Sequence, residues 1–321
     1  MYNFCTLFDI RYLSRGLALY QSLKNTLGKQ FRLYVFPFDE KTLDLLNDMQ
    51  LAQIVVVPLE KIENDKLLSV KKNRTRGEYC WTCTPIIINY CIKKFQLTHC
   101  TYLDADIYFF NSPEVLLNQI GSHDIIITPH HFTPRYDQSF SVGKFCVQFV
   151  YFNCTKNADI VLNHWIEQCL EWCYDRVEPE RFGDQKYLDE WPVRYKGIQI
   201  TNHFGAGVAP WNVQQYRVSE ILNKPHVFNE RLGQTLPVIF YHYHGLKFFK
   251  SNQVDLGGYQ LNHSAIKLLY LPYLKQLKNI ENQLKKVGFD EDAHGVQSRY
   301  QPSLLDKFKR NIKKTYNIVE V

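Results

Sequence analysis

The sequence has no uncharged stretch long enough to cross a membrane, no internal repeat and no low-complexity tract. Its first nine residues lack a basic leader, a long apolar run and a small-residue cleavage site. We therefore expect a cytoplasmic protein that is neither secreted nor membrane-spanning. With 45% apolar residues over 321 positions, the chain can instead bury a large core.

The cysteine pattern does not fit a disulfide framework. The nine cysteines are odd in number, and most of them lie within apolar or aromatic runs. This favours reduced thiols that fill the core in a reducing compartment. Cys80 and Cys83, together with Cys169 and Cys173, offer a zinc site as the alternative, but their spacing does not repeat the paired pattern of a zinc ribbon.

Short β-rich runs alternate with helical runs through the first half of the chain. This alternation predicts an α/β fold with a mostly parallel sheet flanked by helices. The expected strands are 3–8, 31–36, 53–57, 99–103, 125–128 and 147–152, and the expected helices are 13–25, one from Lys41, 84–95, 157–174 and 266–284. Residues 198–210, rich in Gly, His and Asn, read as a loop-dominated substrate region.

Two carboxylates follow the buried strand 99–103. Asp104 and Asp106 leave that strand with only Ala105 between them, at the sheet edge where ligands bind in open α/β folds. A divalent metal prefers hard oxygen ligands, and a diphosphate needs such a metal to neutralise its charge. The same pair can also be a turn and a helix cap, so Asp-X-Asp alone does not decide between the two readings.

Four segments, in the same order along the chain, resemble the pattern of glycosyltransferase family 8, whose members are retaining nucleotide-sugar transferases with the GT-A fold. They are 9–12 (Asp-Ile-Arg-Tyr), 104–106 (Asp-Ala-Asp), 183–185 (Gly-Asp-Gln) and 242–247 (His-Tyr-His-Gly-Leu-Lys). The last segment has one residue fewer before its lysine than the family signature His-x-x-Gly-x-x-Lys. The resemblance covers most of the first 250 residues and implies that fold and that activity for this chain.

The resemblance gives the donor side of the site its roles. It implies that Asp9 and Tyr12 hold the uracil base, and that Asp104 and Asp106 bind the metal. A base can stack on a tyrosine ring while a carboxylate accepts a hydrogen bond from a ring nitrogen. An imidazole from His242 can complete the metal shell, for which Mn²⁺ is the expected ion and Mg²⁺ the alternative.

The remaining phosphate contacts depart partly from the family. Gly245 lets the backbone approach phosphate and Lys247 adds a point charge, although the shortened spacing changes where that lysine stands. His244 is the alternative to His242 as third metal ligand. Arg76, on an expected loop, takes the place of an arginine that the family carries on the helix before the metal strand.

The transfer side of the site is expected at the third segment. Asp184 can stabilise an oxocarbenium-like transition state or position the acceptor, and Gln185 can hydrogen-bond sugar hydroxyls. The alternative for this pair is a simple helix N-terminus. Within residues 201–212, Asn202 and Trp211 are candidate sugar-binding residues because amide and indole groups hydrogen-bond and stack on sugars.

The C-terminal segment carries a second kind of pattern. Residues 303–314 place apolar side chains on one helical face with basic residues around it, namely Leu304, Leu305, Phe308 and Ile312 beside Lys307, Lys309, Arg310, Lys313 and Lys314. Such a helix can lie on an anionic membrane surface or pack on the domain. We therefore divide the chain into a nucleotide-sugar-binding catalytic domain, 1–250, and a helical C-terminal appendage, 251–321, with a basic amphipathic tail.

Together these features predict a metal-dependent glycosyltransferase that moves a sugar from a nucleotide diphosphate donor, a UDP-sugar, to a glycan or lipid-linked glycan, with peripheral membrane contact and no nucleic-acid partner. A sugar-phosphate nucleotidyltransferase of related fold is one alternative, although the first strand is followed by a single glycine instead of a glycine-rich loop. A non-catalytic glycan- or nucleic-acid-binding protein is the other, although the basic and aromatic residues do not interleave in one stripe.

Overall fold

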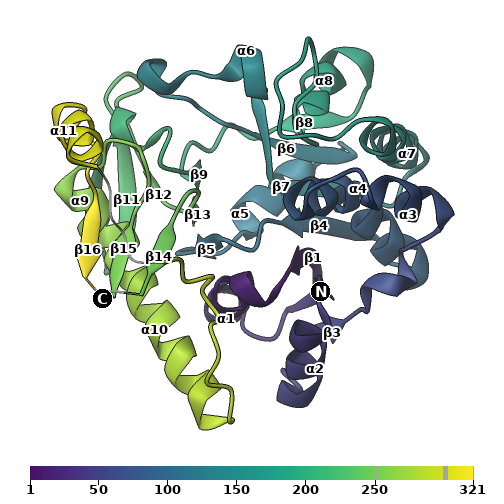
Figure 1. Ribbon diagram of the computed structural model, residues 1–321. Helices are drawn as coiled ribbons and strands as arrows, with labels where there is room; N and C mark the ends of the chain where they lie inside the picture. Colours follow the sequence, from purple (N-terminus) through teal and green to yellow (C-terminus); the bar gives the residue numbers. More distant parts are fainter. Residues whose placement is uncertain (251, 299–302, 321) are drawn as a thin grey trace.

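A seven-stranded sheet flanked by helices forms the centre of the computed structural model, which describes residues 1–250, 252–298 and 303–320 (Figure 1). Ser251 and Val321 of the predicted C-terminal region, and the side chain of Leu304, lie outside this description. The strands follow the order β3-β2-β1-β4-β7-β6-β8. Their bounds are β1 Tyr2–Phe8, β2 Phe31–Pro37, β3 Ile54–Val56, β4 His99–Leu103, β6 Ile125–Pro129, β7 Phe145–Asn153 and β8 Ile198–Ile200.

All neighbouring strands in this sheet pair in parallel except β7, which runs antiparallel to both β4 and β6. The predicted α/β fold with a mostly parallel sheet is confirmed. Because β7 is reversed, its first residues lie beside the carboxyl end of β4, with Phe149 opposite Leu103. This reversal brings the start of β7 to the edge where Asp104 follows β4.

Two hydrophobic clusters cover the two faces of the sheet. Side chains alternate between faces along a strand, so Phe4 and Phe8 of β1 join one cluster, whereas Cys5 and Leu7 join the other. The first cluster includes α1 and α10, and the second includes α4 and α7. The helices are α1 Leu13–Leu27, α2 Glu40–Met49, α3 Asp65–Lys71, α4 Arg76–Lys94, α5 Glu114–Leu117, α6 Ser139–Val142, α7 Lys156–Glu171 and α8 Trp191–Arg194.

Helix α4 begins eight residues earlier than the sequence suggested. Thr75 and Glu78 form a capping box, in which the Thr75 side chain accepts a hydrogen bond from the Glu78 amide and the Glu78 carboxylate accepts one from the Thr75 amide. Pro85, which typically marks a helix start, lies inside the helix instead. Arg76 therefore stands on the first turn of α4, and its expected place on a loop was wrong.

The region predicted as loop-dominated contains two short strands. Besides β8, it holds β9, Ala206–Val208, which belongs to a second sheet of order β5-β13-β9 with β5 Ile107–Phe109 and β13 Phe240–His242. Strand β13 pairs antiparallel with β5, with His242 opposite Ile107. Strands of three residues are too short for a periodic pattern, which is why the sequence did not reveal them.

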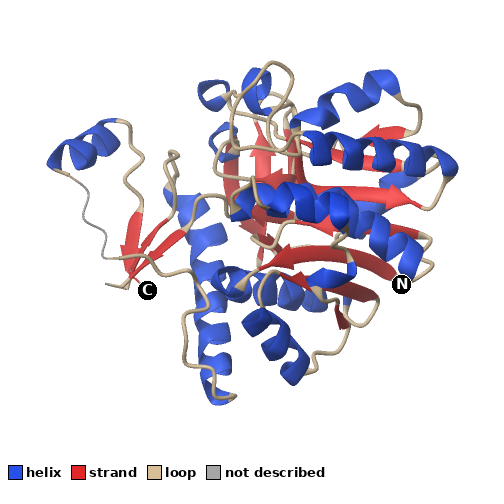
Figure 2. Ribbon diagram, turned by 45° about the vertical axis from the view of Figure 1, so that its right-hand side comes forward, coloured by secondary structure: helices blue, strands red, loops and turns tan. Residues whose placement is uncertain are grey.

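The C-terminal part contains strands as well as the predicted helices (Figure 2). Two three-stranded sheets have the bounds β10 Tyr216–Ile221, β11 Lys224–Asn229 and β12 Gln234–Pro237, and β14 Lys247–Phe249, β15 Gln253–Asp255 and β16 Ile318–Glu320. The helices are α9 His263–Ala265, a π-helical turn Ile266–Tyr270, α10 Leu271–Lys286 and α11 Leu304–Ile312. Among the described residues, no helix combines the length and the apolar composition that crossing a membrane requires.

A buried arginine joins the N-terminal and C-terminal parts of the chain. Arg15 of α1 is 3% exposed, and its guanidinium donates hydrogen bonds to the carbonyls of His294, at 2.9 Å, and Leu246, at 3.0 Å. Buried residues of α10 belong to the same hydrophobic cluster as β1 and α1. The expected boundary at residue 250 stays a prediction, and any such division crosses a continuous core.

Candidate active site

The two aspartates of the Asp-Ala-Asp segment lie between the central sheet and the three-stranded sheet β5-β13-β9. Asp104 directly follows β4, and Asp106 directly precedes β5. The Asp104 amide donates to the Gln148 carbonyl at 3.1 Å, and the Tyr102 hydroxyl donates to Asp104 Oδ1 at 3.0 Å. These bonds fix the chain where it leaves the sheet.

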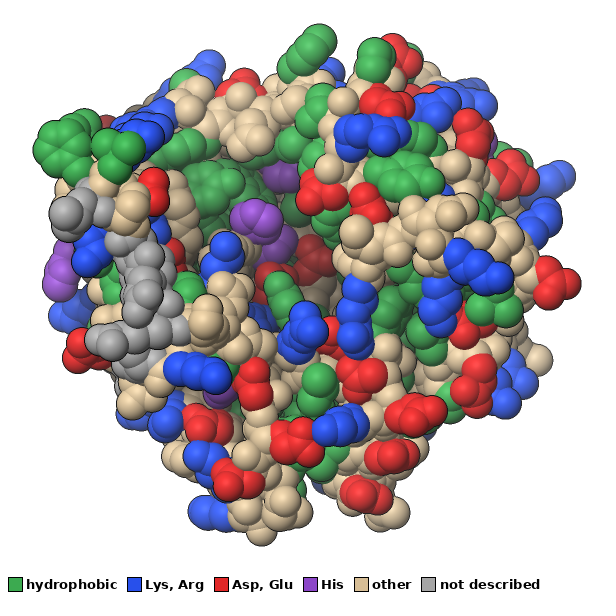
Figure 3. All heavy atoms as spheres, viewed as in Figure 1, with side chains coloured by type: hydrophobic (Ala, Val, Ile, Leu, Met, Phe, Trp, Pro, Cys, Tyr) green, Lys and Arg blue, Asp and Glu red, His purple; other side chains and the backbone are tan. Residues whose placement is uncertain are grey.

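His242 reaches both aspartates from the neighbouring strand β13. Its Nε2 lies 3.2 Å from Asp106 Oδ1 and 3.8 Å from Asp104 Oδ2. The pairing of β13 with β5 explains this approach, because it sets His242 opposite the residue that follows Asp106. The structure thus brings together the three side chains that the sequence suggested as metal ligands, and histidine and acidic side chains meet in a hollow of the face shown in Figure 3.

Gln148, which the sequence analysis did not single out, orients the imidazole of His242. Its Oε1 lies 2.8 Å from His242 Nδ1, so Nδ1 donates the proton and Nε2 faces the aspartates. Gly207 leaves room for this amide, because a Cβ at that position would lie 2.4 Å from Gln148 Nε2. An amide side chain in the middle of the apolar strand β7 was the signal that could have revealed it.

The electrostatics of the cluster show an excess of negative charge. Burial, reinforced by the charge of Asp106, raises the pKa of Asp104 to about 6 although His242 opposes the shift. Burial also acts to raise the pKa of Asp106, but the charge and hydrogen bond of His242 outweigh it and lower that pKa to about 2. Burial acts to lower the pKa of His242, yet the two aspartates raise it well above its usual value. Two carboxylates thus stabilise a proton on the imidazole.

A divalent cation fits this donor set. Metal binding replaces protons on the ligands, and here a cation would take the place of the proton on His242 Nε2. Two carboxylates and an imidazole, whose Nδ1 is held by the Gln148 amide, are ligands that suit manganese or magnesium. Among the described residues, His242 rather than His244 lies within 4 Å of the aspartates. The geometry therefore favours His242 as the third ligand.

Asp184 is buried within electrostatic reach of Asp104. Asp184 is 5% exposed, and its backbone carbonyl accepts a hydrogen bond from Trp165 Nε1 at 2.8 Å. Burial and then the charge of Asp104 raise the pKa of Asp184 to about 8. Gln185 follows it, and its Nε2 donates to the Val142 carbonyl at 2.8 Å, which ties this loop to α6.

The expected base-binding residues lie beside α4. Arg76 Nε lies 2.8 Å from Asp9 Oδ2, and its guanidinium also contacts Asp39 Oδ2 at 2.9 Å. Tyr12 is 43% exposed, and the Arg15 guanidinium stands 4.5 Å from the centre of its ring. Asp9, Tyr12 and Arg76 thus form one group, in which Arg76 is already paired.

The phosphate and sugar candidates occupy different positions. Gly245 has a φ of 78°, which favours glycine, and Lys247 at the start of β14 is exposed. Trp211 is only 4% exposed, and its ring packs 5.2 Å from that of His242 and 5.6 Å from that of His244. Little of the Trp211 face is therefore open to a sugar. Asn202 is exposed after β8, and no contact of the described residues joins it to the aspartates.

Within the described residues, two groups combine three potential metal ligands. One is Asp104, Cys146 and His242, and the other is Cys5, Cys91 and Cys100. The alternative zinc site at Cys80, Cys83, Cys169 and Cys173 is not among them. All nine cysteines are free thiols, and most are buried.

The chain has the fold of the GT-A glycosyltransferases, with a mostly parallel central sheet flanked by helices. The galactosyltransferase LgtC, solved in complex with donor and acceptor sugar analogs, superposes with a TM-score of 0.52 at 12% identity, covering 86% of this chain and 95% of that one. The bifunctional glycosyltransferase WbbM superposes with a TM-score of 0.50 at 11% identity, covering 89% of this chain and 51% of that one.

Similarity in sequence leads to two proteins whose functions are not described. YfnD of Bacillus subtilis (strain 168) is 28% identical over 300 residues, covering 92% of this chain and 94% of that protein. YfnF of the same organism is 27% identical over 309 residues, covering 92% and 97%. Both are called uncharacterized proteins. No protein-family model matches the sequence.

Proposed function

We propose that this chain is a metal-dependent glycosyltransferase that moves a sugar from a nucleoside diphosphate donor, a UDP-sugar, to a glycan or lipid-linked glycan with retention of configuration. One observation carries the proposal. Asp104, Asp106 and His242 converge at the carboxyl end of β4 within the GT-A fold, where two carboxylates share one proton on the imidazole. Such a cluster of charge is suited to a cation and, through it, to a diphosphate.

Mn²⁺, or Mg²⁺ in its place, would supply Lewis-acid neutralisation of the departing diphosphate. Gly245 stands on the turn between β13 and β14, Lys247 is the first residue of β14, and both can approach the same phosphates. Asp9 can accept a hydrogen bond from the uracil ring while Tyr12 stacks on it. Arg76, which bridges Asp9 and Asp39, can turn toward the donor when that pair opens.

Asp184 and Gln185 act on the transfer side. Burial and the charge of Asp104 raise the pKa of Asp184 to about 8, and a cation bound by Asp104 would offset the second of these effects and favour the ionised form. Once ionised, the Asp184 carboxylate can stabilise positive charge that develops at the anomeric carbon. Gln185 holds α6 through Val142, so it shapes the wall against which a sugar would stand. Asn202 can contribute from the exposed end of β8. Trp211 positions the two histidine rings by packing on them.

The acceptor proposal includes contact with the inner face of a membrane. In α11 the apolar side chains Leu305, Phe308 and Ile312 are exposed, while Arg310 anchors the helix to Asp255 at 2.8 Å. Lysines flank this face. We expect the protein to cosediment with anionic vesicles but not with neutral ones, and Phe308→Glu to reduce this binding. Equal binding to both kinds of vesicle would contradict the proposed membrane contact.

The decisive experiment screens nucleoside diphosphate sugars by thermal shift with and without Mn²⁺, followed by hydrolysis or transfer of any sugar that stabilises the protein. We expect a UDP-sugar to raise the unfolding temperature only with the metal. The double variant Asp104→Asn, Asp106→Asn should lose both effects, and full activity in that variant would exclude the proposal. Pyrophosphate release from a nucleoside triphosphate and a sugar phosphate would instead identify a nucleotidyltransferase, and salt-sensitive RNA binding without donor binding a nucleic-acid-binding protein.

A further inference from the structure

A cysteine lies within the proposed metal site. The Sγ of Cys146, one carboxylate oxygen of Asp104 and one ring nitrogen of His242 all lie within 4.8 Å of one another. Strand β7 explains this approach, because it runs antiparallel to β4 and its first residues, Cys146 among them, extend past the pair of Phe149 with Leu103 at the end of β4. The position of Cys146 is fixed by its own backbone, whose carbonyl accepts a hydrogen bond from Thr128 Oγ1 at 3.2 Å.

The separations suit a single ion bound by all three atoms. Zinc binds sulfur at about 2.3 Å and nitrogen or oxygen at about 2.0–2.2 Å, so two ligand atoms of one ion stand at most about 4.5 Å apart. The three atoms here lie within 4.8 Å of one another, so small side-chain rotations would bring them to these distances. Cys146 is 4% exposed, whereas the Asp104 side chain is 27% exposed, so an ion can enter past the carboxylate and meet the thiol from inside the cleft. Gln148 already orients His242 for such an ion.

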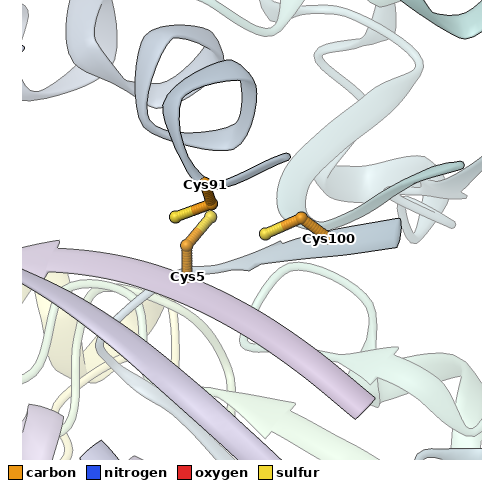
Figure 4. Close-up of side chains that lie close together, drawn as sticks. All are labelled: Cys5, Cys91 and Cys100. Atoms are coloured by element: carbon orange, nitrogen blue, oxygen red, sulfur yellow. The ribbon is translucent and has the colours of Figure 1, made fainter. Parts of the chain in front are cut away.

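The second cysteine group of the molecule shows what an inaccessible thiol cluster looks like. Cys5 of β1, Cys91 of α4 and Cys100 of β4 point toward one another within the core (Figure 4). Each of the three is 0% exposed and belongs to the same hydrophobic cluster. These thiols have no carboxylate or imidazole in their group and no opening to solvent, so they fill space between the sheet and α4. Of the two groups found in the described part of the chain, the one with Cys146 combines a thiol with a carboxylate and an imidazole.

We propose that Cys146 makes this site a dual one, in which Asp104 and His242 bind either manganese together with Asp106, or zinc together with the Cys146 sulfur. Thiolate favours zinc and cobalt, whereas carboxylate oxygen favours manganese and magnesium. When zinc binds, the Cys146 thiol proton and the proton on His242 Nε2 pass to solvent, and the sulfur and the ring nitrogen become ligands of the ion. Because Asp104 and His242 are shared, the two ions exclude each other, and zinc displaces manganese. This inference rests on the metal site of the proposed function, not on the sugar transfer.

Cobalt titration of the purified full chain tests the proposal without any sugar. Co²⁺ bound to a thiolate gives a near-ultraviolet charge-transfer band, and we expect one equivalent of Co²⁺ to produce it and one equivalent of Zn²⁺ to remove it. Cys146→Ser should lose the band and weaken Zn²⁺ binding by at least about 100-fold. Two matched controls should keep the band: Cys154→Ser, which changes an exposed thiol, and Cys100→Ser, which changes a core thiol.

Two further measurements keep the proposal falsifiable if Cys146→Ser folds poorly. X-ray absorption of the zinc-loaded wild-type protein should show one sulfur at about 2.3 Å, and Zn²⁺ should release bound Mn²⁺, detected by its electron paramagnetic resonance. A zinc shell without sulfur, a cobalt band that persists in Cys146→Ser, or Zn²⁺ and Mn²⁺ bound together would overturn the proposal. A confirmed thiolate band with no turnover of any nucleotide sugar would contradict only the proposed function.

Discussion

The candidate site has a metal end, formed by Asp104, Asp106 and His242, and a base end, formed by Asp9, Tyr12 and Arg76, and the two differ in their balance of charge. At the metal end, Asp104 and Asp106 share a single imidazole and are partly buried, so negative charge exceeds its partners. At the base end, Asp9 and Asp39 both pair with the exposed Arg76, and Asp39 also accepts three hydrogen bonds from Ile10 and Thr42. The metal end therefore carries more negative than positive charge. At the base end, the ion pairs of Arg76 must break before a ligand can contact Asp9.

The two ends should therefore bind their ligands in different ways, the metal end by adding a missing positive charge and the base end by replacing an existing ion pair. A cation at the metal end gains interactions without breaking strong ones, except for the proton that it displaces. A donor at the base end must compete with an exposed ion pair, which is worth little in free energy. Substitutions at the metal end should therefore change activity strongly, and those at the base end only modestly.

The largest effect should come from Asp184→Asn, beside the metal end. If Asp184 stabilises the charge that develops on the sugar, its substitution should lower kcat about 100- to 1000-fold while KM for the donor changes little. Initial rates of donor consumption measure both constants. Asp189→Asn, five residues along the same segment, is the matched control, and an equal loss there would point to misfolding of the loop.

The next effect is expected from Gln148→Leu. The substitution removes the amide oxygen that accepts the proton of His242 Nδ1, and Mn²⁺ affinity should fall about 10- to 100-fold. Titration of Mn²⁺ followed by electron paramagnetic resonance gives the dissociation constant. Gln168→Leu removes a glutamine that bonds to Glu190 away from the site and should leave Mn²⁺ binding as it is. Unchanged affinity in Gln148→Leu would remove Gln148 from the metal site.

Arg76→Ala tests the base end. Loss of a charged contact to the donor should weaken donor binding about tenfold, but the free energy of unfolding should change by less than about 1 kcal/mol, because the Arg76 side chain is 46% exposed. Calorimetric titration of the donor and urea unfolding measure the two quantities. Arg217→Ala, which breaks an exposed pair with Glu230, should affect neither. Tighter donor binding in Arg76→Ala would mean that Arg76 only blocks Asp9.

The smallest effect concerns the stability of the base end with pH. Burial acts to raise the pKa of Asp39, but hydrogen bonds from Ile10 and Thr42, and the charge of Arg76, outweigh it and lower that pKa. A lowered folded-state pKa stabilises the protein above the unfolded pKa, and this contribution disappears as pH falls through the folded value. The stability difference between wild type and Asp39→Asn should thus be present at pH 7 and shrink below about pH 4. Urea unfolding at several pH values measures it, and a difference that grows on acidification would refute this account.

The sequence alone determined the elements with a clear period and the residues that follow them. Short runs of apolar, branched and aromatic residues predicted β1, β2, β4 and β7, because a strand buried on both faces is apolar at nearly every position. Helical runs of apolar residues predicted α1 and α7. The acidic pair after β4 was visible for the same reason. Local signals misled where they conflicted, as at Pro85, which suggested a helix start that the capping box at Thr75 had already provided.

Only the tertiary structure decided which side chains meet at the site. His242 approaches the aspartates through the pairing of β13 with β5, and Gln148 and Cys146 approach them because β7 runs opposite to β4. Strand direction and the pairing of three-residue strands depend on contacts between residues far apart in sequence, and no local period encodes them. The sequence thus pointed to a metal site, and the fold added the amide that orients it and the thiol beside it.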